Sequence, residues 1–192
     1  MRYLFILIVL LSQPLFAKPF EAIFAGGCFW CVEADFDKVP GVLETTSGYD
    51  GGTEPKPDYA LVSSGKTAYV EVLRVVYDND KVTYQQLLDF YLRHIDPTVQ
   101  NQQFCDVGKQ YRSVIFYLND DQKKAALASI DEIKKRFPKV YTEVIPSTTF
   151  YPAEDYHQDY YQKMSFQSFP KNQEHLMSHL IYLLNHNHKY LD

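Results

Sequence analysis

The stretch EAIFAGGCFWCVEADFDKVPG, residues 21–41, places a strand, a glycine turn and a helix in direct succession. The apolar run at 21–25 is typical of a short buried strand, which the two glycines at 26–27 bring to an end. A helix is expected from about residue 28 to residue 39, because the Pro-Gly pair at 40–41 cannot continue it. This unit begins the predicted fold, and it contains two of the three cysteines of the chain.

Hydrophobic periodicity predicts the remaining elements. A Val-rich strand is expected at 69–77. Thr83 and Gln86 form a capping box that opens a helix whose apolar face ends at Ile95. The other expected elements are a strand at 41–48, a helical turn near Tyr59, a strand at 111–118, a helix with apolar positions from Ala126 to Phe137, and a strand at 140–145.

The order of these elements is strand, helix, strand, strand, helix, strand, followed by a further helix and strand. This order predicts an α+β fold, a two-layer sandwich with a ferredoxin-like split βαβ core. The connections at 48–66 and 97–110 are longer than usual, and long loops in compact domains often carry function. We therefore expect both to be active-site loops.

Length and charge favour one domain that does not bind nucleic acid, since the chain has 192 residues, a net charge of −5 and no basic stripe. Arg2, an apolar run at 4–11 and the small residue Ala17 have the layout of a signal peptide. Residues 1–17 are therefore expected to direct export, to the periplasm, with an uncleaved membrane anchor as the alternative. Residues 18–192 then form a single catalytic domain with a helical C-terminal tail from about residue 165.

Cys28 lies where the glycine turn meets the helix start, a position at which free backbone N–H groups and the helix dipole favour a thiolate. We therefore expect Cys28 to be a nucleophile rather than a small buried hydrophobe. Cys31 follows one turn later, close enough for a disulfide with Cys28. No second Cys-x-x-Cys or suitable Cys/His pair would complete a zinc site, so no metal is expected.

Several motifs in a common order resemble the A-type methionine sulfoxide reductases, the peptide-methionine (S)-S-oxide reductases. They fall within about residues 21–163 and are Gly27-Cys28-Phe29-Trp30, Ser47-Gly48-Tyr49-Asp50-Gly51-Gly52, Ser64-Gly65-Lys66-Thr67, Gly108-Lys109-Gln110-Tyr111-Arg112-Ser113 and Ala153-Glu154-Asp155-Tyr156-His157-Gln158. The resemblance implies reduction of methionine S-sulfoxide, free or in oxidised proteins, with no cofactor and with a thioredoxin-like reductant. We also expect a monomer.

The resemblance implies roles for individual residues. The matching positions are Cys28 as the nucleophile, Phe29 and Trp30 as the walls of the methyl pocket, Tyr59 and Tyr111 as the phenols that hold the sulfoxide oxygen, Glu71 as the acid, and Asp106 as a polar residue that helps to hold substrate. Glu71 can also be judged from its strand, because it lies in phase with Leu73 and Val75 and both faces are mostly apolar. Desolvation there would raise the pKa of Glu71 toward the range in which it can donate a proton near neutral pH.

Recycling of the nucleophile must be internal if it uses a cysteine, because no cysteine follows Cys105. A sulfenic acid on Cys28 would be converted to a disulfide by a nearby thiol. Helix geometry favours Cys31, whereas Cys105 is close only if the fold brings the neighbouring Asp106 into the same site.

Three other functions are compatible with parts of this sequence pattern. A general thiol-disulfide oxidoreductase would use the pair Cys28 and Cys31 and leave methionine sulfoxide untouched. A cysteine hydrolase would need a histidine placed to activate the thiol, which no motif supplies, and a binding module would need only the aromatic pocket. His157 is expected to be structural, and His175 with His179 to pack on a helix rather than hold a metal.

Overall fold

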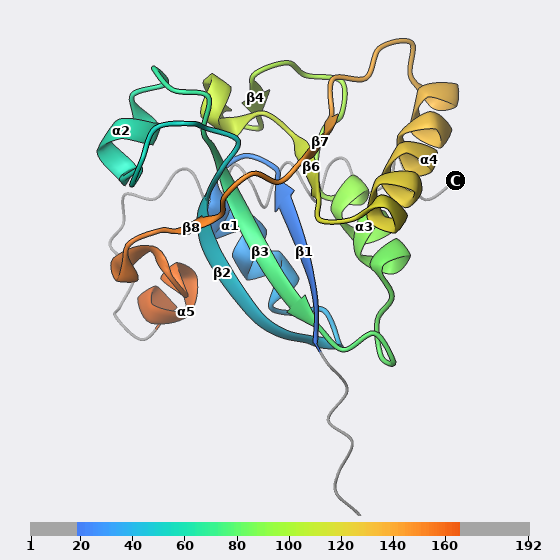
Figure 1. The fold of residues 1–192 in the computed structure, drawn as a ribbon, viewed down its shortest axis with the longest axis horizontal. Coiled ribbons are helices and arrows are strands. Elements are labelled where there is room, and N and C mark those ends of the chain that lie inside the picture. Colours follow the sequence, from blue (N-terminus) through green and yellow to red (C-terminus); the bar gives the residue numbers. More distant parts are fainter. Residues whose placement is uncertain (1–18, 166–192) are drawn as a thin grey trace, which may run out of the picture.

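The computed structural model describes residues 19–165 and shows one six-stranded sheet with helices packed against it (Figure 1). The strands are β1 (Phe20–Ala25), β2 (Val42–Asp50), β3 (Val70–Tyr77), β4 (Gln102–Gln103), β5 (Asp106–Val107), β6 (Val114–Tyr117), β7 (Glu143–Pro146) and β8 (Tyr151–Pro152). The helices are α1 (Phe29–Phe36), α2 (Tyr59–Ser63), α3 (Tyr84–Arg93), α4 (Asp120–Arg136) and α5 (Tyr160–Ser165), with 3-10 turns η1 (Lys109–Tyr111) and η2 (Asp155–His157). Over this range no helix combines the length and the apolar character needed to cross a membrane.

The sheet order confirms the predicted split βαβ core. The strands lie in the order β7-β6-β1-β3-β2-β8, and β4 and β5 form a separate hairpin. β3 runs antiparallel between β1 and β2, so the unit β1-α1-β2 is split by the strand that follows it. β6 pairs antiparallel with the other edge of β1, and β7 adds to β6 in parallel after the crossover helix α4.

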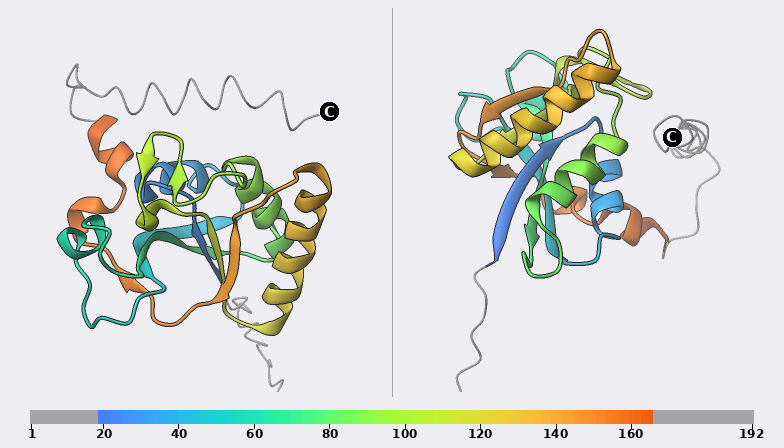
Figure 2. Two further views of the ribbon diagram at one scale, coloured as in Figure 1. Left: turned by 90° about the horizontal axis from the view of Figure 1, so that it is seen from above. Right: turned by 90° about the vertical axis from the view of Figure 1, so that its right-hand side faces the viewer.

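The main core lies between the sheet and the helices α1, α3 and α4, which are seen from two further directions in Figure 2. Phe24 of β1 and Leu73 of β3 are fully buried against these helices. The capping box at Thr83 and Gln86 opens α3 as the sequence predicts. This layer therefore holds α1 rigidly, and the start of α1 carries Cys28.

The opposite face of the sheet is covered by the chain between β7 and β8, which crosses in front of the strands in Figure 1. Phe150 packs on this face, and the guanidinium of Arg74 lies 4.9 Å from its ring centroid. The buried Asp50 carboxylate fixes the crossing, since it accepts hydrogen bonds from the hydroxyls of Ser147 and Thr148 at 2.6 and 3.1 Å. The crossing brings the segment after β8 to the edge of β2.

Several predicted bounds differ from the structure for local reasons. The helix expected to reach residue 39 ends at Phe36, after which the chain tightens into turns. The strand expected from residue 111 begins at Val114, because the N–H of Tyr111 closes a turn onto the carbonyl of Gly108. The strand expected from residue 140 begins at Glu143, because the N–H of Tyr141 is bound to the carbonyl of Pro97.

Candidate active site

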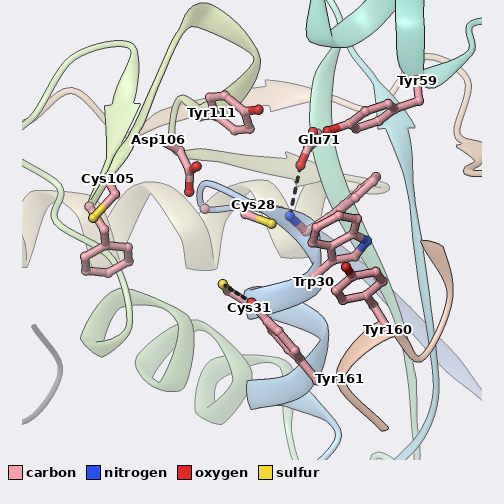
Figure 3. Close-up of a pocket in the computed structure, with 13 residues that line it drawn as sticks. Cys28, Trp30, Cys31, Tyr59, Glu71, Cys105, Asp106, Tyr111, Tyr160 and Tyr161 are labelled. Carbon is pink, nitrogen blue, oxygen red and sulfur yellow. Dashed lines mark hydrogen bonds between the residues drawn. The ribbon is translucent and has the colours of Figure 1, made fainter. Parts of the chain in front are cut away.

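A cavity of about 300 Å³ opens at the start of α1, and every residue to which the sequence assigns a site role lines it (Figure 3). These residues are Cys28, Phe29, Trp30, Cys31, Tyr59, Glu71, Cys105, Asp106 and Tyr111. They come from α1, α2, β3, η1 and the hairpin of β4 and β5. The two long loops expected to be active-site loops, 48–66 and 97–110, both contribute residues to the lining of this cavity.

Gly27 makes the sharp entry into α1 possible. Its φ of +93° lies in the region that favours glycine, and a Cβ there would lie 2.8 Å from Cβ of Gln103. Gln103 is fully buried and accepts the N–H of Asp96 while donating to the Asp96 carbonyl. The hairpin of β4 and β5 therefore lies directly against the glycine turn, which places Asp106 beside Cys28.

Glu71 is buried at the back of the cavity, with 2% of its side chain exposed. Its carboxyl oxygen Oε2 accepts the backbone N–H of Phe29 at 3.1 Å. Burial raises the pKa of Glu71 to about 8, the Phe29 N–H opposes this rise, and the negative charge of Asp106 adds to it. The desolvation expected from its phase with Leu73 and Val75 is therefore present, and the carboxyl can hold a proton at neutral pH.

The expectation that the helix start would favour a Cys28 thiolate is wrong for the resting site. The neighbouring Cys31 thiol and burial both raise the pKa of the Cys28 thiol well above its usual range, and the charges of Glu71 and Asp106 raise it further. The N–H of Phe29, at the helix start, is occupied by Glu71 instead of by the thiol. Cys28 is therefore a protonated thiol at rest and must lose its proton to react.

The phenols of Tyr59 and Tyr111 lie on either side of Glu71 and line the same cavity (Figure 3). Burial raises the pKa of both hydroxyls, and the charge of Glu71 adds to the effect. Both phenols therefore keep their protons at neutral pH and are available as hydrogen-bond donors. This property suits a site that binds a polar oxygen.

Trp30 forms an apolar wall that is held on two sides. Its ring stacks on Tyr160 with centroids 3.7 Å apart and an angle of 5° between the planes. Its indole Nε1–H donates to Nδ1 of His157 at 3.1 Å. His157 is buried, and its ring also contacts Phe29 and Tyr59 at centroid distances of 5.1 and 4.5 Å.

The segment after β8 connects this wall to the sheet edge. Glu154 accepts the backbone N–H of Tyr59 and the hydroxyl of Tyr49, each at 2.9 Å. The Gln158 side chain accepts the N–H of Ser47 and donates to the Ser47 carbonyl, so it pairs with the edge of β2 next to the residues that pair with β8. The structural role expected of His157 is therefore only part of its contribution, because Gln158 holds the strand while His157 orients Trp30.

The three cysteines lie differently around the cavity. Cys31 is one turn after Cys28, its N–H is bound to the Cys28 carbonyl at 3.1 Å, and its sulfur lies 3.4 Å from the hydroxyl of Tyr161. Cys105 is exposed at the tip of the hairpin, next to Phe104, whose φ is +50°. Figure 3 shows Cys31 next to Cys28, and Cys105 beyond Asp106.

Besides Gly26 and Phe104, two further lining residues were given no role in the sequence analysis, Tyr160 and Tyr161 of α5. Their one available signal is their position directly after the motif that ends at Gln158. His175 and His179 lie outside the described residues. Within residues 19–165, no three His, Cys, Asp or Glu side chains lie close enough together to hold a metal ion.

Known proteins with the same motifs match most of this chain. A family model described as peptide methionine sulfoxide reductase matches residues 20–182. The peptide methionine sulfoxide reductase MsrA of Nautilia profundicola is 48% identical over 149 residues, which are 78% of this chain and 86% of that relative.

Solved structures of methionine sulfoxide reductases have the same fold as this chain. Methionine sulfoxide reductase A of Corynebacterium diphtheriae superposes with a TM-score of 0.75 at 30% identity, over 83% of this chain and 80% of the other. Mxr1 of Saccharomyces cerevisiae, in complex with Trx2, superposes with a TM-score of 0.53 at 26% identity, over 74% of this chain and 85% of the Mxr1 chain. On the family match and the identity to MsrA over most of its length, the chain belongs to the peptide methionine sulfoxide reductase family.

Proposed function

We propose that Cys28 is the nucleophile by which this enzyme reduces methionine sulfoxide to methionine, with Glu71 as the acid. The observation that carries the assignment is that the half-buried Cys28 thiol and the buried Glu71 carboxyl, with a pKa of about 8, line one cavity at the start of α1. The Cys28 sulfur attacks the sulfoxide sulfur, and Glu71 protonates the oxygen as the S–O bond breaks. The released oxygen then bonds to the Cys28 sulfur as the bond between the two sulfurs breaks, so that methionine leaves with two added electrons on its sulfur and Cys28 becomes a sulfenic acid.

The cavity walls suit the parts of this substrate. The protonated hydroxyls of Tyr59 and Tyr111 donate hydrogen bonds to the oxygen as its charge develops, and Asp106 helps to hold the polar end of the substrate. Phe29 and Trp30 offer an apolar slot for the S-methyl group. The preference for the S epimer, and for both free and protein-bound methionine sulfoxide, rests on the family resemblance.

Cys31 is the thiol that resolves the sulfenic acid in this proposal. Its backbone N–H is bound to the Cys28 carbonyl, the two residues share the first turn of α1, and both thiols line the same cavity. Attack of the Cys31 sulfur on Cys28 forms the S–S bond and breaks the S–O bond, and the Cys31 proton leaves with the hydroxide as water. Cys105 is the alternative, but it lies on an exposed hairpin tip beyond Asp106.

A thioredoxin-like protein is the proposed reductant, since Mxr1, which shares this fold, has been crystallised with Trx2. Thiol–disulfide exchange would then return both cysteines to thiols. Export rests on the sequence pattern of residues 1–17 alone, and N-terminal sequencing of protein recovered from the periplasm would test it. A monomeric state would be tested by sedimentation.

One experiment tests the nucleophile and the resolving thiol together. A single turnover with a methyl sulfoxide substrate, without reductant, is followed by quantification of methionine or methyl sulfide and by disulfide mapping. We expect one product per protein and a Cys28–Cys31 disulfide. Cys28→Ser should give no product, and product at the wild-type rate from this variant would overturn the assignment. A disulfide to Cys105 in the wild type would assign resolution to that residue instead.

A further inference from the structure

Tyr161 occupies an unusual place, because its phenol oxygen lies 3.4 Å from the sulfur of Cys31, the thiol proposed to resolve the sulfenic acid. The two residues are 130 positions apart, and they meet because α5 packs on α1. Nothing in the first chemical step requires this contact. It lies on the side of Cys31 away from Glu71 and the two phenols that face the sulfoxide oxygen (Figure 3).

The contact is held in place by bonds on both sides of Tyr161. Tyr160 stacks on Trp30, and its backbone N–H is bound to the buried Glu33 carboxyl of α1. Gln162 donates from Nε2 to Asp37 at 2.8 Å, just beyond the end of α1. The Tyr161 hydroxyl therefore has a fixed position relative to Cys31, and its ring needs no rearrangement to serve the sulfur.

The resolving step has an electrostatic problem that this hydroxyl can solve. Cys31 must lose its proton to attack, and negative charges on Cys31 and on the Glu71 carboxyl in the same cavity disfavour each other. Burial and the charges of the two cysteines raise the pKa of the Tyr161 phenol, so the hydroxyl keeps its proton and donates. A hydrogen bond to an ionised partner is about twice as strong as one between neutral groups.

We propose that Tyr161 is a catalytic residue of the second step, which donates its hydroxyl hydrogen bond to the Cys31 thiolate and so makes Cys31 the resolving nucleophile. This inference rests on the proposed function of Cys28 and Cys31. The step is the condensation of Cys28–SOH with Cys31–SH to a disulfide and water, and Tyr161 neither gains nor loses a proton in the balance. It stabilises the charged sulfur during the attack.

Other titratable groups also face Cys31 and have to be separated from Tyr161. Within the cavity they are Cys28, Tyr59, Glu71, Cys105, Asp106, Tyr111 and Tyr160. A small hollow behind Cys31 is lined by Asp35 and His94, and Nδ1 of His94 is 2.7 Å from the carbonyl of Phe90. His94 is the one group among these that can carry a positive charge, so it is the proper control.

The test compares Tyr161→Phe with wild type, Cys31→Ser and His94→Gln in a single turnover without reductant. Rapid quenching measures product of the first step, and thiol counting measures disulfide formation. We expect the first step to be unchanged in Tyr161→Phe, disulfide formation to slow about tenfold or more, and the pH of its half-maximal rate to rise by about one unit or more. His94→Gln should leave the rate and the pH profile of disulfide formation as in the wild type.

The outcomes separate this inference from the proposed function. Equal slowing of both steps in Tyr161→Phe would indicate a structural role and overturn the inference. Disulfide formation at the wild-type rate in that variant would also overturn it. So would a pH profile of disulfide formation that shifts in His94→Gln but not in Tyr161→Phe. Disulfide formation at the wild-type rate in Cys31→Ser would also overturn it. If the wild type fails to reduce the sulfoxide, the proposed function fails. Hydrogen peroxide can then form the Cys28 sulfenic acid directly, so that resolution is still measured.

Discussion

The backbone N–H of Phe29 donates to Oε2 of Glu71 at 3.1 Å, which joins the first turn of α1 to the start of β3. The helix start therefore supports a carboxyl from another strand instead of its own neighbour, the Cys28 thiol. Glu71 is buried and Cys28 is half-buried, and a negative charge on Glu71 raises the pKa of the Cys28 thiol. Proton transfer within this pair, rather than a preformed thiolate, is the expected basis of reactivity.

The first prediction concerns the pH dependence of methionine formation in a single turnover. The reactive state holds one proton for the pair, on Glu71, with Cys28 ionised. Because the pKa of Glu71 is raised to about 8 and that of Cys28 lies higher still, both groups keep their protons below about pH 8. The rate should rise about tenfold per pH unit toward pH 8 and level off there.

Glu71→Gln tests this assignment because the amide oxygen can still accept the Phe29 N–H while the group no longer titrates. Loss of a general acid should lower the rate by about 10²–10⁴-fold, and the bend near pH 8 should disappear. Circular dichroism checks that the fold is kept. A variant that retains the bend would show that another group produces it.

The second prediction concerns the wall formed by Trp30. His157→Phe preserves an aromatic ring against Phe29 and Tyr59 but removes the acceptor of the indole N–H. The loss of one such hydrogen bond, about 0.5–1.5 kcal/mol, should raise KM for a methyl sulfoxide by about 3–10-fold and change kcat less. A double-mutant cycle with Trp30→Phe should show coupling, and strictly additive effects would contradict the role given to this bond.

The third prediction concerns the buried carboxyl of Glu33, which accepts the Ser47 hydroxyl at 3.2 Å. Burial raises the pKa of Glu33 from 4.5 to about 7. Between these values the folded protein holds a proton that the unfolded chain has lost, so stability should fall as pH rises through this window and stay level above it. Glu33→Gln should remove this loss, on the order of 2 kcal/mol.

Denaturant unfolding at pH 5 and pH 8 measures that effect. Ser47→Ala is the informative companion, because the Ser47 hydroxyl lowers the pKa of Glu33 and its removal should extend the window to higher pH. Stability curves for Glu33→Gln and wild type that run parallel from pH 5 to pH 8 would show that Glu33 is not the titrating group.

Local sequence patterns were sufficient for the sheet core, and together with the family motif they indicated the burial of Glu71. Alternation along β3 is a property of neighbouring residues, so it places Glu71 on the same face as Leu73 and Val75 without knowledge of the rest of the fold. The capping box of α3 is local in the same sense. The short strands β4, β5 and β8 have two residues each and leave no periodic signal.

Long-range contacts account for what the sequence did not predict. The pKa of Cys28 is raised most by the neighbouring Cys31 and by burial, and carboxyls from β3 and β5 add to the rise. Tyr161 reaches Cys31 only because the crossing segment carries α5 to α1. Neither the burial of Cys28 nor the contact between Tyr161 and Cys31 can be obtained from residues near Cys28 in the chain.

The last prediction concerns the close approach of β8 to β2 at Gly48, which is paired with Pro152. A Cβ at this position would lie 2.5 Å from both the Phe150 ring and the Tyr151 carbonyl oxygen. Because the carbonyl belongs to the backbone, Gly48→Ala should push β8 away and destabilise the protein by about 1–3 kcal/mol. Leu43→Ala, at an exposed position of the same strand, is the control and should change stability little.

The effect should extend to the site, because β8 leads directly to Glu154. Glu154 holds the backbone N–H of Tyr59, so a shifted β8 moves the phenol that faces the sulfoxide oxygen. Gly48→Ala should therefore raise KM for a methyl sulfoxide at a temperature where the variant is still fully folded. A variant that loses stability but keeps the wild-type KM would show that the segment after β8 adjusts independently of the strand and that Tyr59 is held by other contacts.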